Sequence, residues 1–453
     1  MHLHRSRTLT DSGFTTKPQE GKPVIRNQGS DINLSTGIIL RLYQGLWNIF
    51  LPCLRFSKRL RVGFEQKTLA TPPPRADLWI QAASVGESYL ALELINQLTP
   101  PSPTTVLLTT NTSQGMDILE KIRREHHNSA KIKIHTAYFP FDKPSIMAQA
   151  MAAVRPRAVV LLESELWPGL MKSCRSGNCK LLIINGRMTQ RSLSRYLIRP
   201  SFWKDLRPDA ILAMAHEDGR RFGILFGHDI VDIMGNIKFD RFHSGDDGQN
   251  PAENPIRPLF EPESPFIVLG SVRKEEEEDL AELLRELRQR NPRAIIGLFP
   301  RHMHRLDHWQ KTLTRLGLQW QLRSVTTGPV KPGTVILWDV MGELPQAYEL
   351  AWAAFVGGSL APLGGQNFLE PLSCGLRPVI GPYWDEFSWV GREIMDRKLV
   401  FEAKDRREVA EYLLENIRTP PRRAETRQAL QAYIRNRQGG TGKACKLIID
   451  SIQ

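Results

Sequence analysis

Glu87 is the first residue whose place in the sequence suggests chemistry. It follows the apolar run Trp79-Ile80-Gln81-Ala82-Ala83 through a turn of small residues, Ser84-Val85-Gly86. A glycine there lets a substrate approach closely, and a carboxylate at the start of the next helix can accept a proton from it. The same carboxylate could simply stabilise the positive end of that helix, so the pattern leaves a general base and a helix charge both open.

Two more segments place charges where an apolar run ends. Leu162-Glu163-Ser164-Glu165-Leu166-Trp167-Pro168 sets two carboxylates two residues apart, and such charges are costly unless they are solvated, paired or bound to substrate. Gly235-Asn236-Ile237-Lys238-Phe239-Asp240 offers a lysine near the middle of the chain. Lys238 could reach a phosphate or could pair with Asp240.

The second half of the chain contains a constellation suited to an anionic ligand. Glycine-rich loops that lead into helices expose backbone N–H groups to a phosphate, and Arg301 would add a charge-assisted hydrogen bond. Glu370 is placed to accept hydrogen bonds from ribose hydroxyls. The segments are Pro300-Arg301-His302, Met341-Gly342-Glu343-Leu344, Phe355-Val356-Gly357-Gly358-Ser359 and Gly364-Gly365-Gln366-Asn367-Phe368-Leu369-Glu370-Pro371.

Metal and dinucleotide signatures are missing from the sequence. It has no Gly-x-Gly-x-x-Gly and no Asp-x-Asp, so a metal-held diphosphate has no obvious ligands. His302, His304 and His308 have helical spacing, but no cysteine or carboxylate cluster completes a metal site. We therefore predict neither a metal nor a cofactor.

The elements that must position these residues repeat one pattern. Short runs rich in Val, Ile and Leu alternate with amphipathic stretches of helical length, which predicts α/β domains with parallel sheets covered on both faces. Ligands of such sheets bind beyond the carboxyl ends of the strands. The predicted strands are Leu78–Ala83, Thr105–Thr110, Lys133–Tyr138, Ala158–Leu162, Leu181–Asn185, Ala210–Met214, Phe266–Gly270, Ala294–Phe299, Thr334–Trp338, Ala353–Val356 and Arg377–Gly381.

Length and charge set the domain organisation. A chain of 453 residues is long enough for at least two domains, and residues 241–265, polar and proline-rich, are predicted to link them. Residues 1–75 hold twelve Lys and Arg against four Asp and Glu, a net +8 of the total +13, so the body is nearly neutral. A nucleic-acid protein with a basic face is excluded on this ground. The five scattered cysteines indicate reduced thiols.

The basic N-terminal region, residues 1–75, consists of two segments. Residues 1–36 are polar without a period and are predicted to be a disordered leader. Residues 37–75 begin with a stretch whose polar members, Arg41, Gln44 and Asn48, share one helical face, and a basic run follows. A wide apolar face with Trp and Tyr beside basic residues suits a helix in the surface of an anionic membrane. A core helix docked on the body is the alternative.

Taken together, these segments resemble the 3-deoxy-D-manno-octulosonic acid (Kdo) transferases of Gram-negative bacteria. The resemblance covers about residues 40–450, with the motifs in the same order and at similar separations. It is carried by residues 83–87, 163–168, 185–188, 235–240, 300–302, 341–344 and 355–371.

The resemblance implies a GT-B glycosyltransferase: two Rossmann-like, doubly wound domains facing across a cleft, with an N-terminal amphipathic membrane-associating helix. Residues 76–240 would form the acceptor domain and 266–453 the domain that binds the CMP-sugar. The reaction implied is inverting, metal-independent transfer of Kdo from CMP-Kdo to a lipid A precursor, lipid IVA, in lipopolysaccharide core biosynthesis. The implied location is the cytoplasmic face of the inner membrane, with peripheral or N-terminal anchoring to its anionic surface.

Residue roles follow from the matched motifs. Glu87 corresponds to the catalytic base, and Glu163 and Lys238 to the groups that stabilise the transition state. The CMP site that the resemblance implies consists of Pro300, Arg301, Met341, Gly342, Glu343, Asn367, Phe368, Leu369 and Glu370. No metal, cofactor or nucleic acid is implied.

The sequence departs from the family pattern at two loops, and two rival functions stay open. Gly270-Ser271-Val272-Arg273-Lys274-Glu275-Glu276 replaces a segment that contains histidine in many relatives, and Phe368 stands where proline is usual. One rival is another GT-B nucleotide-sugar transferase or an epimerase. The other is a catalytically inactive homologue associated with the membrane.

Overall fold

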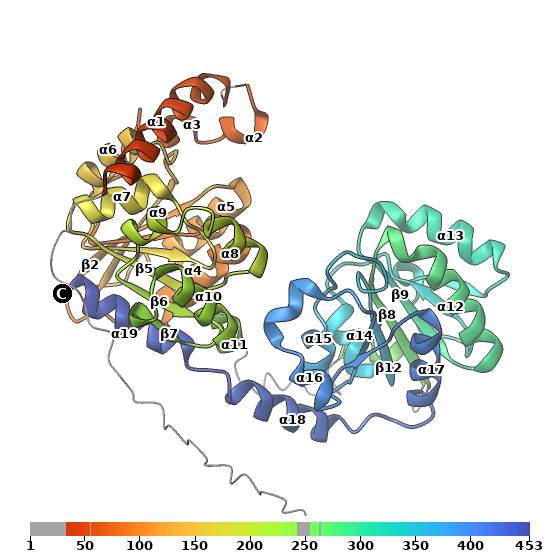
Figure 1. Cartoon of the computed structure of the whole chain (residues 1–453). Helices are drawn as coiled ribbons and strands as arrows, with labels where there is room; N and C mark the ends of the chain where they lie inside the picture. Colours follow the sequence, from red (N-terminus) through yellow and green to blue (C-terminus); the bar gives the residue numbers. More distant parts are fainter. Residues whose placement is uncertain (1–32, 55, 242–253, 262–263) are drawn as a thin grey trace, which may run out of the picture. The chain divides into compact units, whose positions relative to one another are not determined.

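A computed structural model describes residues 33–54, 56–241, 254–261 and 264–453 (Figure 1). The chain forms two compact units. The first runs through Ile237 and takes back Gly439–Gln453 at the end of the chain, and the second comprises Lys238–Gln438. Residues 1–32, most of the predicted leader, lie outside the described residues, as do 242–253 and 262–263 of the predicted linker.

The first unit is built on a sheet of seven parallel strands in the order β3-β2-β1-β4-β5-β6-β7. Alternate residues of its central strands enter two separate apolar cores, Leu78 and Ile80 on one face and Trp79 on the other. The strands are β1 (Leu78–Gln81), β2 (Thr104–Thr110), β3 (Ile132–Tyr138), β4 (Ala158–Leu162), β5 (Lys180–Gly186), β6 (Ala210–Ala213) and β7 (Val231–Ile233).

Helices cover both faces of this sheet, as parallel strands require. One face is covered by α4 (Val85–Gln97), α5 (Ser113–Glu125) and the final helix α19 (Gly440–Ile452). The other is covered by α6 (Pro144–Val154), α7 (Pro168–Ser176), α8 (Gln190–Tyr196), α9 (Pro200–Asp205) and α10 (His216–Phe226). The remaining helices are α1 (Leu34–Leu54), α2 (Lys58–Arg61), α3 (Phe64–Lys67) and α11 (Ile237–Asp240), the last of which crosses into the second unit.

The second unit repeats the plan with a sheet in the order β10-β11-β9-β8-β12-β13-β14, again all parallel. Its strands are β8 (Phe266–Val272), β9 (Ile295–Pro300), β10 (Trp320–Leu322), β11 (Val335–Leu337), β12 (Ala353–Val356), β13 (Val379–Ile380) and β14 (Phe401–Glu402). Its helices are α12 (Glu277–Arg290), α13 (Leu306–Arg315), α14 (Leu344–Leu350), α15 (Leu369–Ser373), α16 (Glu393–Asp396), α17 (Arg406–Asn416) and α18 (Arg423–Arg435).

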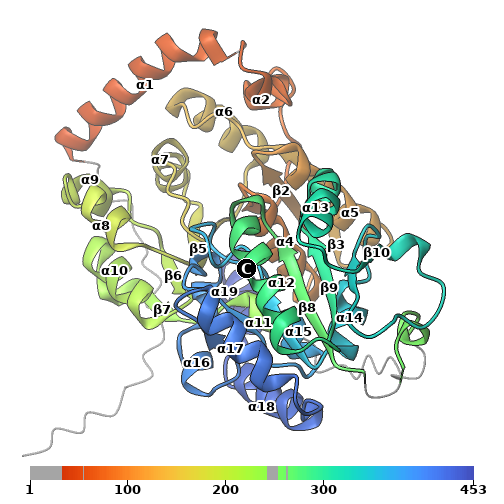
Figure 2. The same cartoon turned by 90° about the vertical axis from the view of Figure 1, so that its right-hand side faces the viewer.

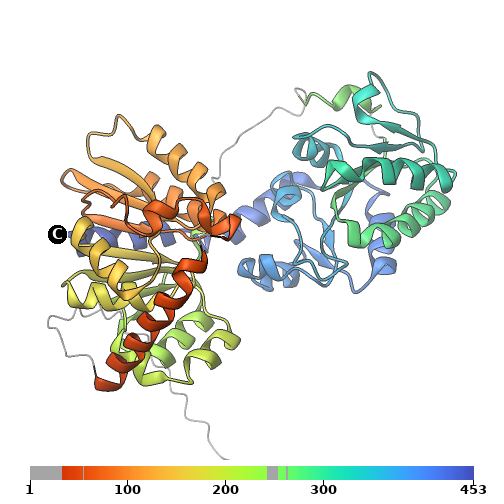
Figure 3. The ribbon, with the colours of Figure 1, turned by 90° about the horizontal axis from the view of Figure 1, so that it is seen from above.

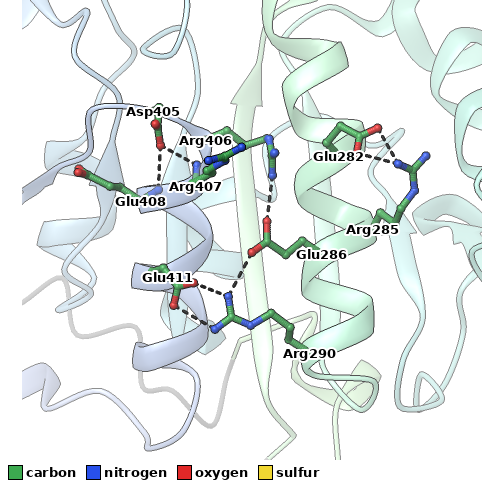
Figure 4. A network of polar contacts seen from close by, with 9 residues as sticks. All are labelled: Glu282, Arg285, Glu286, Arg290, Asp405, Arg406, Arg407, Glu408 and Glu411. Atoms are coloured by element: carbon green, nitrogen blue, oxygen red, sulfur yellow. Dashed lines mark hydrogen bonds and ion pairs between the residues drawn. The ribbon is translucent and has the colours of Figure 1, made fainter.

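A polar network joins α12 and α17 on the outside of the second unit (Figure 4). Arg290 binds Glu411 of α17 and, at 3.1 Å, Glu286 of its own helix, while Arg406 donates to Glu286 at 2.9 Å. Such exposed pairs contribute little stability each, so the leucines beneath them, Leu280, Leu284 and Leu287 among others, hold α12 on the sheet.

Helix α1 lies side-on against the first unit. Asp205 accepts hydrogen bonds from the Asn33 side chain at 2.7 Å and from the Thr36 hydroxyl at 2.6 Å, and the Trp47 ring packs on Phe141 at 5.6 Å. Figure 2 shows the N-terminal end of α1 near α9, and Figure 3 shows this red helix beside the yellow helices of the same unit. The helix begins three residues before the predicted start at Gly37.

The outer face of α1 is apolar and uncovered. It is the one helix in the described part of the chain that is long and apolar enough to cross a membrane by length and composition. Its exposed apolar side chains follow a helical spacing, which places them along the side away from the body. They are Leu34, Ile38, Leu42, Leu46, Ile49 and Phe50.

The predicted α/β fold with parallel sheets is confirmed, and the differences are local. Every predicted strand is present, and Ala158–Leu162 and Ala353–Val356 have the predicted bounds. The sequence analysis missed β7, β10 and β14, which have only two or three residues each and lie toward sheet edges. Part of the predicted linker is structured, since Ile256 and Leu259 are buried in a core of the second unit.

The last helix corrects the predicted domain assignment. Residues 266–453 were predicted to belong to the second domain, yet α19 packs on the first unit (Figure 1, blue). Its buried residues Ala444, Cys445, Ile448 and Ile452 share a core with α4 and the first sheet. Arg157, just before β4, donates to the carbonyl of Ile452 at 2.7 Å. An amphipathic period predicts an apolar face but not which sheet it covers.

This placement predicts that a substitution near the C-terminus destabilises the first unit. Ile448 is fully buried, so Ile448→Ala should lower the free energy of unfolding of that unit by about 2–5 kcal/mol. Urea denaturation followed by hydrogen exchange of peptides from β1 and β4 measures this. Lys446→Ala, exposed on the same helix, should be neutral. Loss of protection confined to the second unit would contradict the assignment.

Candidate functional site

The topology of the first sheet brings two of the predicted motifs to one place. The chain leaves β1 for α4 on one face of the sheet and leaves β4 for α7 on the other. Because β1 and β4 are paired neighbours, their carboxyl ends form the point at which the strand order reverses. Doubly wound sheets bind ligands at this switch point. Glu87 follows β1, and Glu163 and Glu165 follow β4.

Glu87 has both roles that the sequence left open. Ser84 and Glu87 form a capping box at the start of α4, in which the Ser84 N–H donates to the Glu87 carboxylate at 2.9 Å. Glu87 is nevertheless only 6% exposed. Burial, reinforced by the negative charges of Glu165 and Glu163, raises the pKa of Glu87 to about 7. A carboxyl group with such a pKa can accept a proton at neutral pH.

Glu163 and Glu165 occupy a strained turn directly after β4. Glu163 has a left-handed backbone, with φ of 55°, and its N–H donates to the Ile184 carbonyl at 3.1 Å. Burial raises the pKa of Glu165, and one of its carboxylate oxygens is buried without a hydrogen-bond partner among the described residues. The motif containing Glu165 was recognised from the sequence, but Glu163 alone was singled out. The proximity of Glu163 and Glu165 to Glu87 becomes apparent only when the pairing of β1 with β4 is known.

Lys238 belongs to the second unit. The segment before it is held in the first unit, where the buried Asn185 side chain accepts from the Ile237 N–H at 3.0 Å. Lys238 itself lies over the ring of Trp389, 5.6 Å from its centroid, and the next residue, Phe239, packs on the same ring. Asn185, from the Asn-Gly-Arg motif, therefore positions the start of α11, a role that the sequence did not indicate.

The predicted CMP-binding residues all follow strands of the second sheet. Strands β11, β9, β8 and β12 are consecutive neighbours, and the candidate segments leave β9, β11 and β12 at the same edge. Pro300 ends β9, and the next N–H, of Arg301, donates to the Val272 carbonyl at 2.8 Å. Burial raises the pKa of Glu370, and the positive charge of Arg301 partly offsets this increase. The exposed Arg301 and the half-buried Glu370 thus interact electrostatically at this edge.

The segment Met341–Glu343 is partly occupied by its own chain. Glu343 accepts two hydrogen bonds from Arg323, at 2.8 and 3.0 Å, and a third from the Trp338 indole at 2.8 Å. Met341 is 71% exposed, and Gly342 has a positive φ of 89°. A ligand at this loop would therefore meet the backbone and Met341, with Glu343 fixing the turn.

The segment Asn367–Glu370 opens the short helix α15. Asn367 is exposed, and its side chain accepts from the Leu369 N–H at 3.3 Å. Phe368 and Leu369 are core residues, with the Phe368 ring 5.3 Å from that of Phe387. Their side chains are unavailable to a ligand, so only the backbone of 368–369 and the side chains of Asn367 and Glu370 can contribute.

One predicted phosphate loop is wrong. The sequence suggested that the amides of Gly357, Gly358 and Ser359 are open to an anion. In the structure the fully buried carboxylate of Glu276 accepts from the N–H groups of Gly358, Ser359 and Leu360 at 2.6, 2.9 and 2.8 Å. It also accepts from Arg273 N–H at 3.2 Å. The protein thus supplies its own anion to this loop.

No group of three metal-binding side chains occurs within residues 33–54, 56–241, 254–261 and 264–453. His302 and His304 stack with ring centroids 5.5 Å apart, and neighbouring positive charges, after the larger effect of desolvation, lower the pKa of His302. The arginines Arg273 and Arg301 thus place positive charge near His302.

Two parallel sheets of seven strands each, with ionisable groups following their strands, give the chain an α/β fold of the GT-B class. A solved glycosyltransferase from Rickettsia africae has a similar fold, with a TM-score of 0.51 and 12% identity over 84% of this chain and 99% of that one.

The sequence comparisons show which proteins the chain is similar to. The family model of 3-deoxy-D-manno-octulosonic-acid transferase (kdotransferase) matches residues 55–241. The 3-deoxy-D-manno-octulosonic acid transferase of Bordetella pertussis is 29% identical over 90% of this chain and 92% of its own. That of Haemophilus influenzae is 29% identical over 83% and 87%. The chain is thus similar to Kdo transferases over most of its length, which supports the resemblance that the sequence motifs indicated.

The internal anion gives a direct prediction. Glu276→Gln keeps the size of the side chain but turns an N–H group toward backbone donors, so it should destabilise the second unit by about 1–3 kcal/mol. Urea denaturation measures the change. Glu278→Gln, exposed at the start of the same helix, is the matched control and should be neutral. Equal stabilities of the two variants would contradict the role of Glu276.

Proposed function

We propose that this protein is an inverting, metal-independent glycosyltransferase that transfers Kdo from CMP-Kdo to a lipid A precursor, lipid IVA, in lipopolysaccharide core biosynthesis. The observation that carries the proposal is the cluster of Glu87, Glu163 and Glu165 at the switch point of the first sheet, in a chain that is similar to Kdo transferases. The relatives named above carry the name of this activity.

In the proposed reaction Glu87 is the general base. Its carboxylate takes the proton of an acceptor sugar hydroxyl as the hydroxyl oxygen attacks the anomeric carbon of Kdo. The bond from that carbon to the CMP phosphate oxygen breaks, and CMP leaves with the electron pair. Burial and the neighbouring carboxylates support this role because together they raise the pKa of Glu87 to about 7. Glu163 and Lys238 are proposed to stabilise the transition state.

The second unit is proposed to bind CMP. Arg301 can form a charge-assisted hydrogen bond with the phosphate, and Glu370 can accept from the ribose hydroxyls. Pro300, Met341, Gly342, Asn367 and the backbone of Phe368 and Leu369 would complete the site, with Glu343 holding its loop. The opposite charges of Arg301 and Glu370 at one edge of the sheet support this assignment.

Helix α1 is proposed to attach the protein to the cytoplasmic face of the inner membrane. It is bound side-on to the first unit, and its uncovered face is apolar. A helix held along its length by polar contacts suits a position in the membrane surface better than one across the bilayer. The acceptor is itself a lipid, so this position would bring the enzyme to its substrate.

The base assignment predicts the behaviour of Glu87→Gln. Glutamine can still accept from the Ser84 N–H but cannot take a proton, so transfer should fall by about 10²–10⁴-fold while the first unit stays folded. Wild-type activity should fall as the pH drops below about 7, since protonated Glu87 is no base. Mass spectrometry of lipid IVA incubated with CMP-Kdo counts the Kdo transferred.

The matched contrast is Arg301→Ala. This variant should bind CMP more weakly by about 1.5–3 kcal/mol, the value of a hydrogen bond to a charged group, whereas Glu87→Gln should bind CMP like the wild type. Calorimetry measures both, with a uridine nucleotide as the competing ligand. Full transfer by Glu87→Gln, or tighter binding of the uridine nucleotide than of CMP, would overturn the proposed function.

The membrane assignment predicts that Leu42→Asp/Leu46→Asp detaches the protein. Both leucines are exposed, at 65% and 52%, so the fold should tolerate the change. Removing two leucines from the acyl boundary costs at least ~3 kcal/mol, or roughly a hundredfold in affinity. Sedimentation with vesicles of anionic phospholipid measures this. Val325→Asp, at a 68% exposed position of the second unit, is the control, and equal sedimentation of both variants would exclude α1 as the anchor.

A further inference from the structure

Asp142, in the loop between β3 and α6, caps a helix other than its own. The first helical residue of α7 is Pro168, which has no N–H, and the N-cap residue Trp167 supplies no side-chain acceptor. The N–H groups of Gly169 and Leu170 donate instead to the two carboxylate oxygens of Asp142, at 2.9 and 2.8 Å. Since the Met171 N–H donates to the Trp167 carbonyl, Asp142 satisfies the donors at the start of α7 that the helix leaves open.

The contact between Asp142 and α7 is close and buried. A Cβ atom at position 169 would lie 2.5 Å from the Asp142 carbonyl oxygen, so only glycine fits there. Asp142 is 1% exposed. Burial raises the pKa of its carboxyl group to about 7, although the hydrogen bonds from Gly169 and Leu170 act in the opposite direction.

Helix α1 packs against the same region of the first unit. The Tyr43 hydroxyl donates to the Asp142 carboxylate at 3.1 Å, on the oxygen that also accepts from Gly169. The Trp47 ring packs on Phe141, and Gln44 exchanges two hydrogen bonds with Ser145, at 2.9 and 3.1 Å. The membrane-facing helix therefore contacts the very carboxylate that caps α7.

Helix α7 begins immediately after the loop that carries Glu163 and Glu165. Only residues 163–167 separate the end of β4 from Pro168, so the two ends of this loop are fixed by the strand and by the start of α7. Trp167, the last residue of the loop, packs on Phe139, whose ring centroid is 5.3 Å from that of Trp167. Phe139 lies three residues before Asp142 and also contacts Trp79 of β1. The segment Phe139–Asp142 thus contacts the end of this loop twice: Phe139 packs on Trp167, and Asp142 binds the first N–H groups of α7.

We propose that Asp142 is a positioning residue that couples the seating of α1 to the geometry of the loop Glu163–Trp167. On this proposal α1 is a part of the catalytic fold as well as a membrane anchor, and its tyrosine helps hold the α7 cap that places Glu163 and Glu165 beside Glu87. The inference rests on the proposed function for its kinetic consequence, whereas its structural consequence stands without it.

The test uses the full-length protein and three variants. Asp142→Asn leaves one oxygen to accept and turns an amide N–H toward the second donor. Tyr43→Phe removes only the hydrogen bond from α1. Thr36→Val is the matched control, because it breaks the contact of α1 with Asp205 and touches neither Asp142 nor α7. Hydrogen exchange of the peptide that spans 163–170 is measured first, followed by kcat and KM for CMP-Kdo with a detergent-dispersed lipid IVA acceptor.

The expected result is graded. Asp142→Asn should accelerate exchange at Gly169 and Leu170 and lower kcat by roughly tenfold or more, with KM for CMP-Kdo within about twofold because the nucleotide binds in the second unit. Tyr43→Phe should shift both readouts in the same direction by less, and Thr36→Val should shift neither. Because a loss of folded protein would also lower the apparent kcat without changing KM, kcat is referred to the concentration of folded protein, measured by CMP binding.

Two results would overturn the proposal. Unchanged exchange at residues 163–170 in both Asp142→Asn and Tyr43→Phe would show that the cap does not hold the loop. Equal kcat losses in Tyr43→Phe and Thr36→Val would show that α1 acts only as a tether. If Asp142→Asn does not fold, Tyr43→Phe against Thr36→Val decides the matter. A wild-type protein that transfers no Kdo would refute the proposed function, and the exchange measurement would still decide the coupling.

Discussion

A parallel strand that is covered by helices on both faces has apolar surroundings on both sides. A charged side chain can therefore reach solvent or a ligand only at an end of the strand. The first unit obeys that constraint, since Trp79 and Leu78 enter opposite apolar cores and the carboxylates of the candidate site follow Gln81 and Leu162. The reversal of strand order between β1 and β4 then decides which strand ends become neighbours. Glu87, Glu163 and Glu165 meet because of topology, although 75 residues or more separate the first from the others.

The sequence predicted what depends on local pattern. Buried strands are read from their apolar runs, and Glu87 and Arg301 are found because each follows one. The sequence did not predict which residues far apart in the chain contact each other. Nothing near Gly358 indicates that its N–H will meet Glu276, 82 residues earlier in the chain. The apolar face of 440–452 likewise does not say which of two similar sheets it will cover, and short edge strands such as β14 carry too few residues to form a pattern.

Several candidate residues serve the fold and the chemistry at once. Glu87 closes a capping box, Asn367 accepts from the Leu369 N–H at the start of α15, and Glu343 binds Arg323 and Trp338. Residues held by such bonds keep a fixed orientation, which a reaction that depends on charge placement requires. The alternatives that sequence reasoning sets against each other, helix charge or general base, therefore need not exclude one another. Here the structural bond is what holds the carboxylate in place for its proposed chemistry.

The return of the chain to its first unit has a consequence for how the gene can be divided. The polypeptide crosses between the units twice, at Ile237–Lys238 and again at Gln438–Gly439. A fragment that stops at the linker would lack α19 and leave Leu94 and Ile95 of α4 without their apolar cover. Conversely, a fragment that starts at the linker would contain α19 but not the first sheet, so the apolar face of this helix would be uncovered. The linear order of the sequence and the division into folding units do not coincide, so one cut at the linker separates α19 from the sheet that it covers.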